Sequence, residues 1–272
     1  MLKEMVATKH GELEVSSGGK LHYRESGEGG PVLLIHGTGG AAWFGSVERI
    51  AARHRVVDYD RRGFGGSTPL ATPGYLASQI SDAVALVEKR GLRNAVVVGH
   101  SWGGIVALGL AIRAPELVGR LVLMEPPLHA KSSPTPAFLA AFLRVQFLRR
   151  FSGDEAAARA FFTFAMAQRG GPNTFDRLPS QARKEILGNA AASLVELDAG
   201  TGEELTDAEV SSVRHPVLIL KGASTQTIFK KVTDRLASKL THAQVRVLPA
   251  AGHMMQFDQP DEFLAAVLDV AG

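Results

Sequence analysis

The stretch Val96-Val97-Val98-Gly99-His100-Ser101-Trp102-Gly103-Gly104 decides the fold. An apolar run of the kind found in buried strands leads directly into the pattern G-x-S-x-G, and a segment of helical composition follows it. A strand–turn–helix elbow of this type lifts the serine hydroxyl clear of the sheet. Side chains at Gly99 and Gly103 would clash across so tight a turn. The pattern therefore marks Ser101 as a candidate nucleophile.

Strands and helices alternate on both sides of this elbow. A hairpin is expected first, with strands over residues 12–16 and 20–25 joined at Ser17-Gly18-Gly19. Short apolar runs without polar alternation are typical of parallel strands buried on both faces, and they occur at residues 32–35, 55–58, 95–98, 121–124, 217–220 and 245–248. Helical patterns lie between most of these runs. We predict an α/β fold with a mostly parallel eight-stranded sheet and helices on both of its faces.

The alternation is interrupted once, between residues 126 and 213. No convincing strand occurs there, and helices are expected over residues 134–151, 154–168 and 180–191. A separate second domain of this length is one interpretation. Resumption of the strand–helix rhythm after Pro216 favours the other, a cap inserted into the core. The predicted organisation is a core of residues 1–126 and 214–272 with a helical cap of residues 127–213.

Composition excludes several classes of protein. The chain has 272 residues, no cysteine, 45% hydrophobic residues and a formal net charge of +3. Absence of cysteine excludes a disulfide scaffold and a thiolate nucleophile. The basic residues form no run longer than a pair, so no nucleic-acid partner is expected. No stretch is long and apolar enough for a signal peptide or a spanning helix, so we expect no membrane partner and a cytoplasmic location.

Four motifs in order resemble those of α/β-hydrolase-fold serine hydrolases. His36-Gly37-Thr38-Gly39-Gly40 follows the third predicted strand, where that family has its oxyanion loop. Residues 60–67, Asp-Arg-Arg-Gly-Phe-Gly-Gly-Ser, resemble the family's D-x-R-G-x-G-x-S segment. The elbow at 99–104 is the third motif. Gly252-His253, followed by Pro260 and Phe263, resembles the catalytic-histidine loop. The resemblance extends over essentially the whole core and leaves the cap as its variable part.

The resemblance implies roles for individual residues. Ser101 would be the nucleophile, and His253 would be the base that takes its proton and returns it to the leaving group. The backbone N–H groups of Trp102 and of the Thr38–Gly39 turn would form the oxyanion hole. His36 is expected to be structural.

The catalytic acid departs from the commoner family pattern. The segment after the strand at 217–220 carries Thr225 where many members have a carboxylate. Glu125, at the end of the strand that follows the nucleophile helix, is the better candidate because neighbouring strand ends open onto one crevice. Haloalkane dehalogenases and zearalenone lactonases place the acid at this strand end. Asp234 and Asp198 are the next candidates.

Serine at position 101 separates this chain from haloalkane dehalogenases and epoxide hydrolases, which use aspartate there. We expect a hydrolase of carboxylic esters or lactones that acts through an acyl-enzyme. A faint resemblance of residues 222–229 to zearalenone lactonases raises a lactone as a candidate, although the His-Gly oxyanion turn differs from those enzymes. A carbon–carbon hydrolase or a cofactor-free perhydrolase would use the same triad. A non-catalytic ligand-binding member of the fold is the alternative from another class.

The partner expected is a small, apolar ester or lactone. The cap is rich in phenylalanine, and such side chains both bury helices and line apolar pockets. His100, Phe138, Phe142 and Met254 are the candidate pocket residues. No metal-ligand spacing occurs, so neither a metal nor a cofactor is expected. The sequence carries no signal for oligomeric state.

Overall fold

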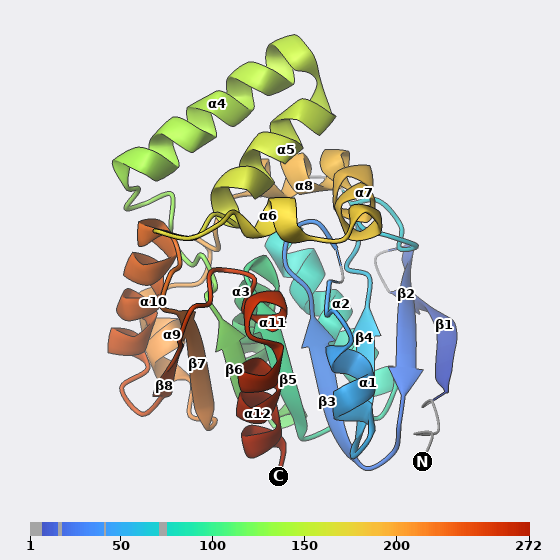
Figure 1. Ribbon diagram of the computed structural model, residues 1–272. Coiled ribbons are helices and arrows are strands. Elements are labelled where there is room, and N and C mark those ends of the chain that lie inside the picture. Colours follow the sequence, from blue (N-terminus) through green and yellow to red (C-terminus); the bar gives the residue numbers. More distant parts are fainter. Residues whose placement is uncertain (1–6, 16–17, 41, 71–74) are drawn as a thin grey trace, which may run out of the picture.

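The computed structural model describes residues 7–15, 18–40, 42–70 and 75–272 (Figure 1). Its centre is one eight-stranded sheet with the order β1-β2-β4-β3-β5-β6-β7-β8. The first pairings, β1 with β2 and β2 with β4, are antiparallel and all others are parallel. The strands are β1 (Thr8–Val15), β2 (Gly19–Ser26), β3 (Gly30–Ile35), β4 (His54–Tyr59), β5 (Ala95–His100), β6 (Val118–Met124), β7 (Val217–Gly222) and β8 (Gln244–Leu248).

The middle of the sheet explains the apolar runs of the sequence. Val97 of β5 pairs with Leu33 of β3 on one side and with Leu121 of β6 on the other. All three side chains are fully buried, because helices cover both faces of a parallel sheet. The predicted α/β fold and its eight-stranded, mostly parallel sheet are confirmed. Two residues of the predicted hairpin, Ser16 and Ser17, lie outside the described residues.

Helices cover the two faces of the sheet as two separate layers. On one face α2 (Tyr75–Lys89), α3 (Trp102–Arg113) and the end of α10 (Thr227–Lys239) pack on the strands. On the other face α1 (Ser46–Ala51) and α12 (Pro260–Ala271) do so, and the short α11 (Met255–Asp258) directly precedes α12. A single 3-10 turn, η1 (Pro115–Leu117), precedes β6. No helix in the described part of the chain is long and apolar enough to cross a membrane.

Six helices occupy the interval between β6 and β7, and residues 125–216, all of them described, contain no strand. In Figure 1 the long helix α4 lies at the top of the molecule, with α5 to α8 between it and the sheet. The helices are α4 (Pro136–Ser152), α5 (Asp154–Ala165), α6 (Thr174–Arg177), α7 (Ser180–Gly188), α8 (Ala190–Ala199) and α9 (Asp207–Ser212). The single helix expected over 180–191 is therefore wrong: the chain bends at Asn189, and α8 continues to Ala199.

The end of this interval packs with the core. Leu205, Val210 and Val213 are buried in the same cluster as the side chains of α3 and the sheet. Helix α9 also contacts α3 and α10. The helices that lie over the strand ends are thus α4 to α8, whereas the chain from Leu205 onward has returned to the core face. The cap boundary of residues 127–213 stays a prediction.

Candidate active site

Ser101 stands at the junction of β5 and α3 in a strained conformation. Its backbone angles are φ 52° and ψ −125°, a region that residues with a Cβ rarely adopt. The elbow is so tight that a Cβ on Gly99 would lie 2.6 Å from the Gly103 carbonyl oxygen. A Cβ on Gly103 would overlap the backbone carbonyls of Ile35 and His36 in β3 and the turn after it. The elbow therefore forms as the sequence pattern predicts, with the Ser101 side chain at the carboxyl ends of the strands.

Glu125 and His253 lie together although they are 128 residues apart in the chain. Nδ1 of His253 is 2.8 Å from Oε2 of Glu125, and both side chains are buried. Glu125 directly follows β6, and His253 lies in the loop between β8 and α11. With Nδ1 donating to the carboxylate, Nε2 carries the free lone pair that a general base needs. The structure thus brings the proposed acid and base together at the strand ends.

Two further donors fix the Glu125 carboxylate. The Gly222 backbone N–H donates to Oε1 at 2.8 Å, and the Thr225 hydroxyl donates to Oε2 at 2.8 Å. Burial raises the pKa of Glu125, and these two donors oppose that rise by favouring the carboxylate. Burial also lowers the pKa of His253, which keeps its imidazole neutral. Thr225, at the position where many family members carry the acid, here supports an acid on the neighbouring strand.

Two further residues, Phe229 and His100, hold His253 in place. The Phe229 ring stacks on it with centroids 3.7 Å apart and planes 9° apart. Nε2 of His100 donates to the His253 carbonyl oxygen at 3.0 Å. No hydrogen bond joins the Ser101 hydroxyl to His253 in the described residues, and such bonds often tighten only when substrate is bound. His100 is therefore a residue that positions the histidine loop.

The turn after β3 passes over the elbow. A Cβ on Gly37 would lie 2.9 Å from the Ser101 Cβ, so this turn approaches the serine closely. Within the described residues, the Thr38 and Gly39 backbone N–H groups donate to no other group. The Trp102 N–H lies in the first turn of α3, where backbone donors lack intrahelical partners. These N–H groups are the ones that the sequence analysis assigns to an oxyanion hole.

An apolar cavity of about 40 Å³ lies above Ser101. Thr38, Ser101 and Trp102 line its floor. Phenylalanines of α4, α5 and α10 contribute to the remaining walls, namely Phe138, Phe142, Phe161, Phe164 and Phe229. Phe138 and Phe142 line it as expected. His100 and Met254 do not: His100 is turned toward the histidine loop, and Met254 is buried in a cluster with side chains of α5, α6 and α7.

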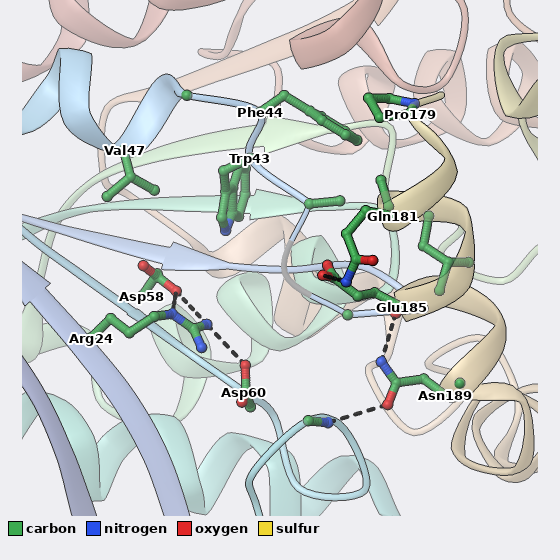
Figure 2. Close-up of a pocket in the computed structure, with 18 of the residues that line it drawn as sticks. Arg24, Trp43, Phe44, Val47, Asp58, Asp60, Pro179, Gln181, Glu185 and Asn189 are labelled. Atoms are coloured by element: carbon green, nitrogen blue, oxygen red, sulfur yellow. Dashed lines mark hydrogen bonds and ion pairs between the residues drawn. The ribbon is translucent and has the colours of Figure 1, made fainter. Parts of the chain in front are cut away.

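A second, open cleft of about 850 Å³ lies beyond the same turn, where Gly39 and Gly40 form one edge. Figure 2 shows Arg24 between Asp58 and Asp60 on its floor, with Trp43 above them. Helix α7 forms the opposite wall. The cleft is much more polar than the cavity above Ser101, because charged side chains make its floor.

The other candidate acids lie away from His253. Asp234 pairs with Lys221 at 2.5 Å, and Asp198 pairs with Arg149 at 2.6 Å, both with partly exposed side chains. Neither contacts the histidine loop. Among the described residues, no group of three His, Cys, Asp or Glu side chains could hold a metal ion. Glu125 is thus the carboxylate that the structure places within reach of the base.

Buried histidines should make the fold sensitive to acid. Burial lowers the pKa values of His36 and His100 to about 3. In the unfolded chain both histidines bind a proton below about pH 6.5, whereas in the folded protein they stay neutral. Lowering the pH from 7 toward 5 therefore stabilises the unfolded state relative to the folded one. The prediction concerns these two histidines, because His253 is hydrogen-bonded to the buried Glu125 carboxylate and does not titrate independently of it. We expect the free energy of unfolding to fall by about 2 kcal/mol per pH unit below pH 6.

Urea unfolding followed by tryptophan fluorescence between pH 7.5 and 5 measures this dependence. Substitution His100→Gln should reduce the slope by about half, since it removes one of the two protons. A free energy of unfolding that stays constant or rises as pH is lowered would contradict the assignment of neutral, buried histidines.

Sequence reasoning missed three contributors to the site. The first two, Thr225 and the Gly222 N–H, act on Glu125 from β7 and the turn after it. The third is Glu196 of α8, fully buried, whose Oε1 accepts a hydrogen bond from the Thr38 hydroxyl at 2.6 Å. A fully buried glutamate needs a partner, but the sequence does not indicate that residue 196 is buried.

Comparisons with known proteins identify the family of this chain. The alpha/beta hydrolase family matches residues 32–266. Relatives include "Putative carbamate hydrolase RutD" of Caulobacter, 29% identical over 88% of this chain and 89% of that protein. Another is pimeloyl-[acyl-carrier protein] methyl ester esterase of Vibrio parahaemolyticus, 30% identical over 92% of this chain and 98% of that protein.

Among solved structures, the enol-lactonase from Burkholderia xenovorans shares the fold. The two chains superpose with a TM-score of 0.80 at 20% identity, over 95% of this chain and 98% of that one. The family match extends from β3 to α12 and includes the elbow, Glu125 and the histidine loop. The chain therefore belongs to the α/β hydrolase family.

Proposed function

We propose that this hydrolase cleaves carboxylic esters or lactones through an acyl-enzyme on Ser101. The observation that carries the proposal is the contact between His253 Nδ1 and Glu125 at the same strand ends as the strained serine. A serine made nucleophilic by a histidine, with N–H donors nearby, is suited to acyl transfer. Relatives that include a methyl ester esterase support this reading.

In the first half-reaction, His253 Nε2 takes the Ser101 proton as the oxygen attacks the substrate carbonyl carbon. The developing oxyanion accepts hydrogen bonds from the Trp102 N–H and from the Thr38–Gly39 turn. The imidazolium, stabilised by the Glu125 carboxylate, then protonates the leaving alkoxide. Water repeats the sequence on the acyl-enzyme, releasing the acid and restoring Ser101. In a lactone the leaving alkoxide stays attached to the acyl group.

The walls and the volume of the cavity above Ser101 indicate which substrate groups it could bind. Its walls are almost entirely apolar, which suits an acyl or aryl group. Its volume of about 40 Å³ is far below that of ligand pockets, which are roughly 300–1,000 Å³. Substrate binding therefore requires the phenylalanines of α4 and α5 to move apart. The Lys131 ammonium, which also lines the cavity, lies 5.5 Å from the centroid of the Phe142 ring of α4.

A substrate panel tests the reaction class. Purified protein is assayed with 4-nitrophenyl acetate, butyrate and octanoate, γ- and δ-lactones, an aryl carbamate and a vinylogous diketone. We expect turnover of esters or lactones that is lost in Ser101→Ala. Cleavage of the carbamate or of the diketone in preference to every ester and lactone would contradict the proposal, as would activity that survives in Ser101→Ala.

A further inference from the structure

We infer that cap helix α8 is a clamp that holds the oxyanion hole in its working geometry, with Glu196 as its central positioning residue. The inference rests on the proposed function, because it assigns a role to the N–H donors around Ser101. Contacts that the motifs of the sequence do not reveal connect this helix to the core. The cap would then complete the catalytic machinery as well as cover the pocket.

Three points along α8 each hold a residue of the proposed oxyanion hole. At its start, the Asn189 side-chain amide donates to the Gly39 carbonyl oxygen at 3.0 Å and accepts from the Gly65 N–H at 3.2 Å, as Figure 2 shows. In its second turn, Glu196 accepts from the Thr38 hydroxyl at 2.6 Å. Immediately after its end, the Gly200 carbonyl oxygen accepts from Trp102 Nε1 at 3.1 Å.

Glu196 is held by a second buried contact. Arg61 Nη1 donates to Glu196 Oε2 at 2.5 Å, and neither side chain is exposed. The Tyr75 hydroxyl donates to the same oxygen at 3.3 Å. Removal of one partner of a buried charge pair strongly destabilises the folded protein, because the other charge is then buried without a counter-charge. The position of the Glu196 carboxylate is therefore fixed by its partners in the core.

Arg61 extends the clamp to both sides of the serine. Its Nε donates to the His36 carbonyl oxygen at 2.9 Å, directly before the oxyanion turn. Its guanidinium carbon lies 5.3 Å from the centroid of the Trp102 ring. The Arg61–Glu196 pair thus contacts the turn that carries Thr38 and the residue that follows Ser101. Displacement of α8 would release both sets of N–H donors together.

Loosening of the clamp should affect the rate of the chemical step and not the binding step. Oxyanion donors act in the transition state, so loosening them should slow the chemical step and leave initial binding almost unchanged. The probe is an alkyl fluorophosphonate, which phosphonylates an activated serine and places its phosphoryl oxygen among the same donors. Its maximal rate constant, kinact, reports chemistry, and its half-saturation concentration, KI, reports binding.

Thr38→Val removes the hydroxyl that Glu196 holds and keeps the shape of the side chain and the Arg61–Glu196 pair. We expect kinact to fall about tenfold with KI within twofold of the unmodified protein, since misplacing one donor costs less than its full removal, about 10²–10³. Thr38→Ser restores the hydroxyl and should recover most of the rate. Glu196→Gln should lower kinact further and also lower the melting temperature, because Arg61 is then left without its counter-charge.

The matched control is Asp198→Asn on the same helix, which breaks the exposed pair with Arg149 and should leave kinact unchanged. If Thr38→Val reacts at the rate of the unmodified protein, or Thr38→Ser is as slow as Thr38→Val, the clamp is contradicted. A purely structural role would lower the melting temperatures and leave kinact of the folded variants unaltered, which also overturns it. Failure of the unmodified protein to react at all would instead overturn the proposed function on which the clamp rests.

Discussion

Substitution Glu125→Gln is expected to lower kcat by about 10³ or more while the protein stays folded. The amide is isosteric with the carboxylate but cannot satisfy the same three donors, from Gly222, Thr225 and His253. If its NH₂ group faces His253, Nδ1 becomes the acceptor and the imidazole proton moves to Nε2. The Nε2 atom then has no free lone pair with which to accept the proton of Ser101. If its oxygen faces His253, the negative charge that stabilises the imidazolium is still lost.

The measurement is steady-state hydrolysis of the best ester or lactone from the panel, with circular dichroism to check the fold. Asp234→Asn is the matched control, because Asp234 was the next candidate acid and forms only an exposed pair with Lys221. Its activity should equal that of the unmodified protein. Near-normal turnover by Glu125→Gln would show that Glu125 is not the acid of the triad.

Substitution Gly103→Ala is expected to destabilise the fold by about 3 kcal/mol or more. The added methyl group would overlap the backbone carbonyls of Ile35 and His36, and backbone atoms in the middle of a sheet cannot move aside as a flexible side chain could. The fold must therefore separate α3 from β3, which also displaces Ser101 from the oxyanion turn. Activity should fall together with stability.

Gly188→Ala is the matched control, since Gly188 lies in helix α7 and a Cβ there would meet nothing within 4 Å. Replacement of a helical glycine by alanine commonly stabilises a protein by about 0.4–1 kcal/mol. Urea unfolding of both variants at pH 7.5 gives the comparison. If Gly103→Ala is as stable as the unmodified protein, residue 103 cannot lie as close to the carbonyls of Ile35 and His36 as the structure places it.

The sequence predicted well those parts of the molecule whose local structure is determined by residues close together in the chain. The run Val96–Val98 can be buried only as a strand between other strands, and G-x-S-x-G fits a strained turn directly after it. Alternating strands and helices then fix a parallel sheet, and chain order places Glu125 and His253 at the same edge. The strand pattern is confirmed by the structure.

The contacts that the sequence did not reveal are those that residues between β6 and β7 make with the core. Glu196 lies in the segment Ala190–Ala199, which looks like any alanine-rich helix. Its role arises from Arg61 and Thr38, more than 130 residues away. Asn189 was expected inside a continuous helix, yet the chain bends there and its side chain bridges two loops of the core. Contacts of this kind are set by the docking of the cap, which leaves no periodic pattern in the sequence.

Covalent labelling shows most directly whether Ser101 is an activated nucleophile. The 272-residue protein is incubated with an alkyl fluorophosphonate, and intact mass and peptide mass spectrometry then locate the adduct. The account predicts one adduct per chain, on the peptide that contains Ser101, and none on the Ser101→Ala variant. Absence of an adduct on Ser101 in the folded protein, or an adduct that persists in Ser101→Ala, would contradict it.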